Sequence, residues 1–239
     1  ASNNTAVGSS ALVANSTGYE NVAVGKDSLK ANTTGFRNQS FGTDSLLANT
    51  TGQDNTALGK SGLQDNTTGS YNVAAGNYAL ANNTTASNNT AVGYYALEAN
   101  TTGADNVAVG KGALDANTTA NSNTGIGLDA LGAATTGGGN TAVGSSALAA
   151  NTTATVNTAV GYQTLLSNTT GTENVAVGAY ALDAQTTSSY NTAVGHNAGT
   201  ANSTGSQNVF VGRHSGYANT TGANNVVVGS GAFSTATTG

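Results

Sequence analysis

One 17-residue unit repeats fourteen times along this chain without an insertion or a deletion. A short period that never slips is typical of stacked repeat architectures, in which each repeat contacts only its neighbours. We therefore expect one solenoid array over residues 1–239, with the last repeat cut short at Gly239. We number the positions of the unit 1 to 17 from the asparagine of its N-[TV]-A-V-G sequence, which occurs at Asn4, Asn21, Asn38, Asn55, Asn72, Asn89, Asn106, Asn123, Asn140, Asn157, Asn174, Asn191, Asn208 and Asn225.

Composition excludes several classes of protein. Charged residues make up 7% of the chain, the net charge is −5, and the six cations are scattered, so we expect no nucleic-acid partner. No apolar run reaches the ~18 residues of a membrane span, so we expect none in this segment. Cysteine is absent, which excludes disulfides and thiolate metal sites. Proline is also absent, as suits a β-structure in which nearly every backbone N–H is needed.

The pattern within the unit predicts an all-β fold. Two glycines per repeat and many β-branched and asparagine residues oppose a helix. Positions 2 and 4 share one face of an extended segment, and positions 1, 3 and 5 share the other. We expect two short strands per coil, at positions 1–4 and 8–11, with glycine and asparagine supplying positive φ angles at the corners. The expected fold is a parallel β-solenoid, or β-roll, of fourteen coils.

Three positions are the same in all fourteen copies: Asn at position 1, Gly at position 5 and Thr at position 14. Stacked coils would give each of them a ladder of identical neighbours, as in cross-β structures. Besides the asparagines above, we expect ladder roles for Gly8, Gly25, Gly93, Gly110, Thr17, Thr34, Thr102 and Thr119. The expected core consists of apolar residues at positions 4 and 9, among them Val7, Val24, Val92, Val109, Leu12, Leu29, Leu97 and Leu114.

This core is thin, because each coil offers only three or four small apolar side chains. Position 3 is Ala in ten copies, and position 8 is small in most, so we expect a smooth stripe of small residues on the outside. Such a stripe suits contact between protomers. We therefore expect a homo-oligomer, in the first place a trimer, with end-to-end or lateral assembly as a further prospect.

The sequence Asn89-Thr90-Ala91-Val92-Gly93-Tyr94-Tyr95-Ala96-Leu97 resembles the head repeats of YadA-type trimeric autotransporter adhesins. With the following A-N-T-T-G, the unit is also similar to repeats of phage tail-fibre-like proteins that precede intramolecular chaperone domains. The resemblance covers essentially the whole chain. It implies a parallel β-roll, trimerisation, and a location outside the cell, on the cell surface or on a virion tail fibre. One departure is the constant 17-residue length, because YadA-like head repeats are usually shorter and more variable.

Other motifs suggest rival interpretations. The N-T-T or N-S-T sequences match N-glycosylation acceptors, but we expect them to be turns with stacked side chains. Regular threonines raise the alternative of ice binding, although positions 13 and 14 would point opposite ways and we expect position 2 to face the core. His196 and His214 fall on adjacent coils without the partners of a catalytic triad. Tyrosines at positions 6 and 7 raise the alternative of contact with a host or prey surface glycan: Tyr78, Tyr94, Tyr95, Tyr162 and Tyr180.

The preferred interpretation is a non-enzymatic structural module, without a catalytic site, cofactor or metal. It would form the rigid shaft or head of an extracellular trimeric adhesin or tail-fibre-like protein. The repeat phase at both ends leads us to expect a piece of a longer chain. Position 9 changes in the last three copies to Gly199, Gly216 and Phe233, which we interpret as approach to another domain or a surface for filament formation.

Overall fold

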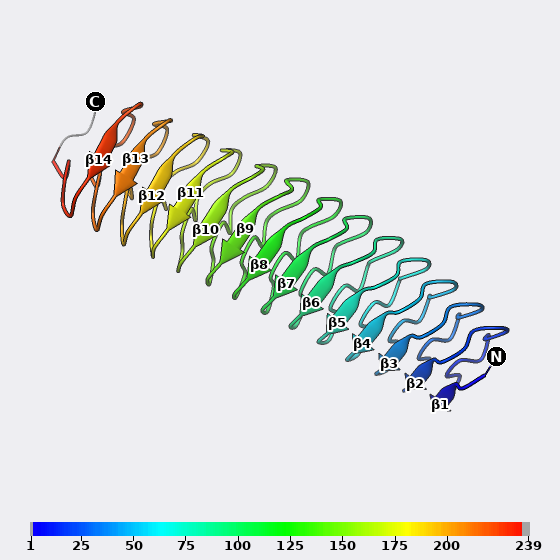
Figure 1. Ribbon diagram of the computed structural model, residues 1–239. Coiled ribbons are helices and arrows are strands. Elements are labelled where there is room, and N and C mark those ends of the chain that lie inside the picture. Colours follow the sequence, from blue (N-terminus) through cyan, green and yellow to red (C-terminus); the bar gives the residue numbers. More distant parts are fainter. Residues whose placement is uncertain (1, 236–239) are drawn as a thin grey trace. The chain divides into compact units, whose positions relative to one another are not determined.

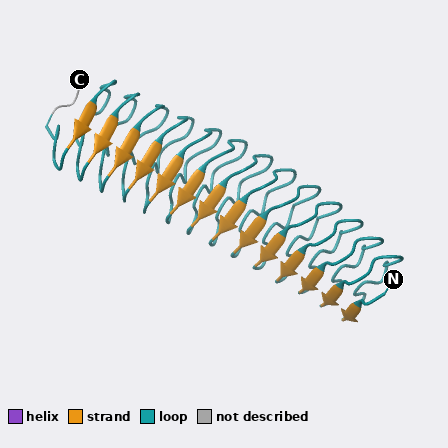
Figure 2. Cartoon of the chain, viewed as in Figure 1, coloured by secondary structure: helices purple, strands orange, loops and turns teal. Residues whose placement is uncertain are grey.

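The computed structural model describes residues 2–235 and is an all-β parallel solenoid, in which each 17-residue repeat forms one coil (Figures 1 and 2). The predicted fold class is therefore confirmed. The chain divides into two compact units, Ala1–Asn121 and Ser122–Gly239, each of which is a stack of coils. Because the same positions recur in every coil, one coil serves to explain the others within its unit.

Each coil contributes one strand of three residues at positions 2–4. Successive strands of a unit pair in parallel with the same register, so that Thr90 lies opposite Val107 and Val92 opposite Val109. The strands of the first unit are β1 (Thr5–Val7), β2 (Val22–Val24), β3 (Gln39–Phe41), β4 (Thr56–Leu58), β5 (Val73–Ala75), β6 (Thr90–Val92) and β7 (Val107–Val109). Those of the second unit are β8 (Thr124–Ile126), β9 (Thr141–Val143), β10 (Thr158–Val160), β11 (Val175–Val177), β12 (Thr192–Val194), β13 (Val209–Val211) and β14 (Val226–Val228).

The second strand expected at positions 8–11 is wrong, because these residues form turns. Positions 7 and 9 have left-handed backbone, with φ of 59° at Tyr95 and 54° at Leu97. The segment still bonds to the next coil, since the N–H of Leu97 donates to the carbonyl of Ala113 at 3.0 Å. The two left-handed residues break the alternation of side chains, so that Ala96 and Leu97, although adjacent, are both buried.

The core is built from positions 3, 8 and 9, as in Ala91, Ala96 and Leu97, whose exposed fractions are 0%. In the first coil Leu12 is only half-buried. The position 9 leucines that are fully buried are Leu29, Leu46, Leu63, Leu80, Leu97, Leu114, Leu131, Leu148, Leu165 and Leu182.

The expectation that position 4 lies in this core is wrong. Val7 is 57% exposed and Val92 39% exposed, while Val24 and Val109 are half-buried. The leucine at position 9 fills the space beneath the strand, so that only the small side chain of position 3 fits there. Positions 2 and 4 therefore point outward.

The expected outer stripe of small residues is also wrong, for the same reason. Ala23, Ala57, Ala79 and Ala113, at positions 3 and 8, have exposed fractions of 0%. These alanines allow the strand to approach the leucine row closely inside the coil, so they form no surface between protomers.

The glycine of position 5 is needed at the corner after each strand. Gly93 has φ of 138°, and a Cβ atom there would lie 2.5 Å from the carbonyl oxygen of Gly110 in the next coil. Any residue with a Cβ atom is excluded here, both by this backbone contact and by the φ angle. The invariance of position 5 thus has a structural cause, and it holds for Gly8 and Gly25 as well, while Gly110 shares the positive φ angle, at 135°.

The change of position 9 near the end of the second unit is an exchange of volume within the core. Phe210 replaces the usual alanine at position 3 and is fully buried. A Cβ atom on Gly199 would lie 2.6 Å from the Phe210 ring, and one on Gly216 would lie 2.2 Å from it. The phenylalanine ring therefore occupies the space that leucines fill in earlier coils, and the core itself accounts for both glycines.

This exchange predicts a compensating pair of substitutions. Phe210→Ala should lower the free energy of unfolding by about 3–5 kcal/mol, because it leaves a cavity. Gly216→Leu alone should also destabilise, because its side chain meets the ring. The double variant should be more stable than the sum of the two losses, with a coupling of about 0.5–3 kcal/mol in urea denaturation. Additive losses would contradict the exchange.

Candidate functional site

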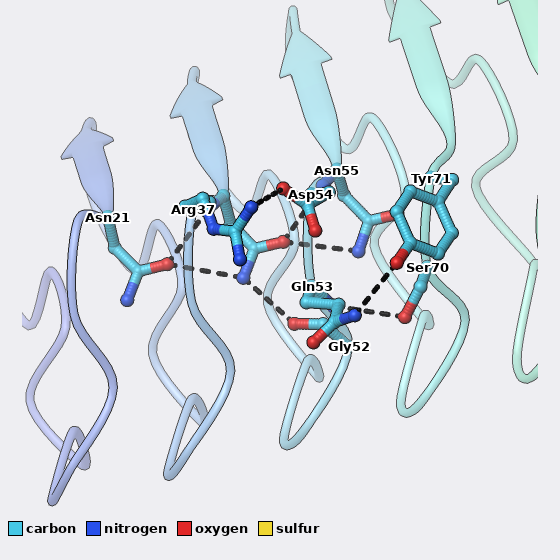
Figure 3. Close-up of polar contacts among 9 residues, drawn as sticks. Asn21, Arg37, Gly52, Gln53, Asp54, Asn55, Ser70 and Tyr71 are labelled. Carbon is cyan, nitrogen blue, oxygen red and sulfur yellow. Dashed lines mark hydrogen bonds and ion pairs between the residues drawn. The ribbon is translucent and has the colours of Figure 1, made fainter.

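The asparagines of position 1 form a buried ladder (Figure 3). The backbone N–H of Asn38 donates to Oδ1 of Asn21 at 3.0 Å, and that of Asn55 donates to Oδ1 of Asn38 at 3.1 Å. Nδ2 of Asn38 donates to the carbonyl of Gly52 across the same coil at 2.9 Å. The amide of Asn38 thus joins two coils and also closes its own coil, and this double role explains why position 1 is always asparagine.

The asparagines of position 12 form a second buried ladder. Nδ2 of Asn66 donates to Oδ1 of Asn49 at 2.8 Å and to the carbonyl of Gly69 at 3.0 Å. In the second unit, Gln185 takes this position, and its Nε2 donates to the carbonyl of Ser188 instead. Oδ1 of Asn168 has no partner among the described residues. The position 12 ladder therefore tolerates a residue other than asparagine. Position 1, in contrast, is asparagine in all fourteen copies.

The same asparagines are those of the N-T-T and N-S-T sequences. Their burial and their hydrogen-bonded Nδ2 atoms leave no room for a glycan in the folded chain, and Asn15 in the first coil is half-buried. The structure agrees with the interpretation of these sequences as turns. The fully buried members are Asn32, Asn49, Asn66, Asn83, Asn100, Asn117, Asn151, Asn168, Asn202 and Asn219.

The threonine ladder lies at position 13 and not at the invariant position 14. The hydroxyl of Thr33 donates to the carbonyl of Thr50 at 3.1 Å, and that of Thr50 to the carbonyl of Thr67 at 3.0 Å. The threonines of position 14 point away from the coil and, within the described part of the chain, their hydroxyls form no hydrogen bond with the protein. Thr17, Thr34, Thr102 and Thr119 are all of this exposed kind.

The outward side chains of positions 2 and 4 form an uncharged surface in each unit, with an apolar row at position 4 and mainly threonine and valine at position 2; we call this surface the strand face. Leu58 is 44% exposed and Phe41 40%, and each aligns with its neighbours one coil away. No charged residue occurs at either position in any copy. The strand face consists of Thr, Val and other uncharged residues at Thr5, Val7, Val22, Val24, Gln39, Phe41, Thr56, Leu58, Val73, Ala75, Thr90, Val92, Val107 and Val109 in the first unit. Its members in the second unit are Thr124, Ile126, Thr141, Val143, Thr158, Val160, Val175, Val177, Thr192, Val194, Val209, Val211, Val226 and Val228.

The tyrosines singled out in the sequence gather in two separate clusters. In the first unit, the ring centroids of Tyr78 and Tyr95 lie 5.1 Å apart, and those of Tyr94 and Tyr95 lie 4.0 Å apart. Nζ of Lys60 lies 5.5 Å from the centroid of Tyr78. A hydrogen bond with Tyr94, together with desolvation, raises the pKa of Tyr95 to about 12. Tyr95 is therefore uncharged at neutral pH, and Lys60 places a cation beside the cluster.

In the second unit, Tyr162 and Tyr180 lie 5.4 Å apart and continue into residues that sequence reasoning did not connect with them. His196 lies 6.1 Å from Tyr180, and His214 lies 5.7 Å from His196. The available signal was that these residues fall at positions 6 and 7 of consecutive coils, where side chains stack one coil apart.

Charged side chains lie at the turns, outside the ladders. The guanidinium of Arg37 lies 3.5 Å from the carboxylate of Asp54, and Nε2 of Gln53 donates to the hydroxyl of Tyr71 at 3.0 Å (Figure 3). Exposed pairs of this kind add little to stability. The Arg37–Asp54 pair lies at the turns of its coils, so it leaves the strand face without charge.

The two histidines adjoin aromatic and amide groups. Nε2 of His214 lies 3.1 Å from Nδ2 of Asn197. Desolvation, followed by the charges of Arg213 and His196, lowers the pKa of His214. Across residues 2–235 there is no group of three or more metal-ligating side chains, no enclosed pocket, and no helix long and apolar enough to cross a membrane.

Neither a scan against models of protein families nor searches of curated proteins and of solved structures returned a match for this chain.

The ladder of position 12 predicts a local cost for Asn66→Ala. The substitution removes two buried hydrogen bonds donated by Nδ2 and takes away the acceptor of Asn83, so the free energy of unfolding should fall by about 2–4 kcal/mol. The matched control is Asn82→Ala, because Asn82 is exposed on the neighbouring coil. Equal midpoints for the two variants in urea denaturation would show that the ladder contributes nothing.

Proposed function

We propose that this chain is a non-enzymatic structural module that associates with two further copies through its strand face. It would serve as a shaft or head segment of an extracellular adhesin or a tail-fibre-like protein on a cell surface or virion. The observation that carries the proposal is the strand face itself, an uncharged surface whose position 4 row is apolar in every coil of each unit.

The exposure of this surface calls for a partner. Monomeric soluble proteins rarely expose contiguous apolar surface beyond a few hundred Å², and larger patches mark interaction sites. Here Val73, Val175 and Val194 are each about two-fifths exposed, and Val194 stacks between Val177 and Val211 in the position 4 row. Burying such side chains releases roughly 25 cal/mol for each Å² removed from water.

A second copy of the same chain suits this surface best. The strand face repeats with each coil, at a strand spacing of ~4.8 Å. A partner must present apolar groups with the same repeat, and another copy of this chain does so. Symmetric association of identical subunits is also the usual form of oligomer. The resemblance of the repeat to YadA-type heads supports three copies around one axis.

Charged substitutions on the strand face test the proposal. The wild type should sediment with three times the 23.2 kDa of one chain. The variant Leu58→Lys with Val92→Lys should sediment as a monomer, because both side chains are exposed and would be buried as unpaired charges. Leu128→Lys is the matched control, since Leu128 is 47% exposed but lies at position 6, where Lys60 and Lys111 occur naturally.

Two results would overturn this assignment. One is a wild type that sediments as a monomer; the other is a control variant that dissociates as much as the strand-face variant. Far-UV circular dichroism should be the same for all three proteins, because the substituted side chains lie outside the core.

One observation favours a second candidate, ice binding by the same face. Position 2 points outward, contrary to the sequence expectation, so that two outward rows lie two residues apart on a regular sheet. Position 2 is Thr in seven copies, at Thr5, Thr56, Thr90, Thr124, Thr141, Thr158 and Thr192. Evenly spaced methyl and hydroxyl groups on a flat sheet are the features by which β-solenoids order water.

Thermal hysteresis separates the two candidates. If the face binds ice, a monomeric wild type should depress the freezing point below the melting point, and Thr56→Lys with Thr90→Lys should abolish the difference. The Leu128→Lys control should retain it. A trimer without hysteresis, measured by nanolitre osmometry, would reject ice binding and leave self-association.

A further inference from the structure

Tyrosine is the most easily oxidised side chain that this chain contains. Cysteine, methionine and tryptophan are all absent, while there are nine tyrosines. An oxidant that removes single electrons therefore acts on the phenol rings, where the loss of an electron and a proton gives a phenoxyl radical. The fate of such a radical depends on whether a second tyrosine lies against it.

Tyr78 and Tyr95 lie against each other because they occupy the same place on adjacent coils. Both are at position 7, and their backbone φ angles are 60° and 59°. Equivalent backbones one strand spacing apart, ~4.8 Å, direct the two side chains in parallel. The rings accordingly stack, with centroids 5.1 Å apart and an interplanar angle of 19°. The coils themselves therefore hold this pair together.

The other tyrosine contacts within residues 2–235 lack this parallel arrangement. Tyr94 is tilted by 58° from Tyr95 and by 77° from Tyr78. In the second unit, Tyr162 and Tyr180 meet at 83°. Radical coupling joins ring carbons through orbitals that are perpendicular to the ring planes. Parallel rings in contact are thus aligned for coupling, and steeply tilted rings are not.

Solvent reaches the pair, and further contacts hold each of its rings. Tyr78 and Tyr95 are half-buried. The phenol of Tyr95 is hydrogen-bonded with that of Tyr94, and Nζ of Lys60 lies 5.5 Å from the ring centroid of Tyr78. A radical on either ring therefore meets its partner in the same chain before it meets a tyrosine of another molecule.

We propose that Tyr78 and Tyr95 form a site of oxidative cross-linking, at which a peroxidase with hydrogen peroxide converts the pair into dityrosine. Each phenol loses one electron and one proton, and the two radicals join through a bond between the ring carbons ortho to their oxygens. The hydrogens on those two carbons then move to the oxygens, which restores both phenols. Hydrogen peroxide takes up the two electrons and two protons and leaves as two molecules of water.

The product is a covalent link between the coils of β5 and β6. It closes a loop between residues 17 positions apart, so the unfolded chain loses conformational freedom. The proposal goes beyond the structural function above and does not depend on it, because position 7 lies outside the strand face.

The test treats the full chain with a haem peroxidase and hydrogen peroxide, followed by denaturation and trypsin. Cleavage after Lys60 and Lys111 releases residues 61–111, which include Tyr71 and the three clustered tyrosines. We expect this peptide to become lighter by two hydrogen atoms and to fluoresce as dityrosine. In tandem mass spectrometry, backbone cleavage between residues 78 and 95 should no longer separate fragments. A peptide that keeps its mass, or dityrosine that joins only separate chains, would overturn the proposal.

Phenylalanine variants separate the chemistry from the packing, because phenylalanine keeps the stacked ring but lacks the phenol. Tyr78→Phe and Tyr95→Phe should each lower the yield of dityrosine in the peptide at least tenfold. The matched controls are Tyr94→Phe in the same cluster and Tyr71→Phe. Tyr71 is 54% exposed, and no ring contact joins it to the cluster within the described chain. Both controls should keep the yield of the wild type, and loss of the yield in both would contradict coupling at the stacked pair.

Urea denaturation then tests the link between coils. Oxidation should raise the midpoint of the wild type and leave that of Tyr95→Phe unchanged. Equal shifts in the two proteins would show that no link between these coils forms. All variants should sediment like the wild type, so failure of this proposal is distinct from failure of the trimer.

Discussion

Identical groups stacked one strand spacing apart are the constraint on which the whole chain depends. Each side chain must tolerate a copy of itself at ~4.8 Å on either side. The amide of Asn38 meets this demand because its Oδ1 accepts two hydrogen bonds from Asn55, while its Nδ2 donates to Oδ1 of Asn21 and to the carbonyl of Gly52. Glycine at position 5 meets it by having no side chain. A charge stacked in the same way would face like charge in the interior, which is unfavourable.

Side chains on the outside of the coils also stack on those of the neighbouring coils, but they need not be identical. Turn residues such as Arg37 and Asp54 differ between coils and form opposite-charge pairs one repeat apart. Aromatic rings stack wherever they fall on successive coils, as in Tyr78 with Tyr95. Any surface feature that recurs is therefore extended into a row. Side chains at one place on the coil therefore line up along the stack, as in the strand face and in the rings of Tyr162, Tyr180 and His196.

The repeat period, the parallel coils and the stacking of the position 1 asparagines were predictable, since a constant spacing of 17 residues admits few other folds. Which face of the strand points into the core was not predictable. Alternation shows that Thr90 and Val92 share a face, but it does not show which face is inward. Valine seemed the better core residue than alanine, yet the coil encloses Leu97 and leaves space only for Ala91. The backbone of Leu97, with φ of 54°, is left-handed, which is unfavourable for a leucine in isolation. Closure of the coil imposes this conformation, so local sequence preference could not predict it. The row of rings from Tyr162 to His214 was missed in part because its members span four repeats.

The burial of the position 12 asparagines means that folding of the coil and glycosylation of these residues exclude each other. Oligosaccharide transfer to Asn-X-Thr requires an accessible amide nitrogen, and in the finished coil Nδ2 of Asn66 or Asn100 is already committed to neighbouring oxygens. A chain that entered a glycosylating compartment unfolded would be modified at sites where the coil has no space for sugar. Such a chain could not close its coils. An oligosaccharide on these asparagines is thus incompatible with the closed coil.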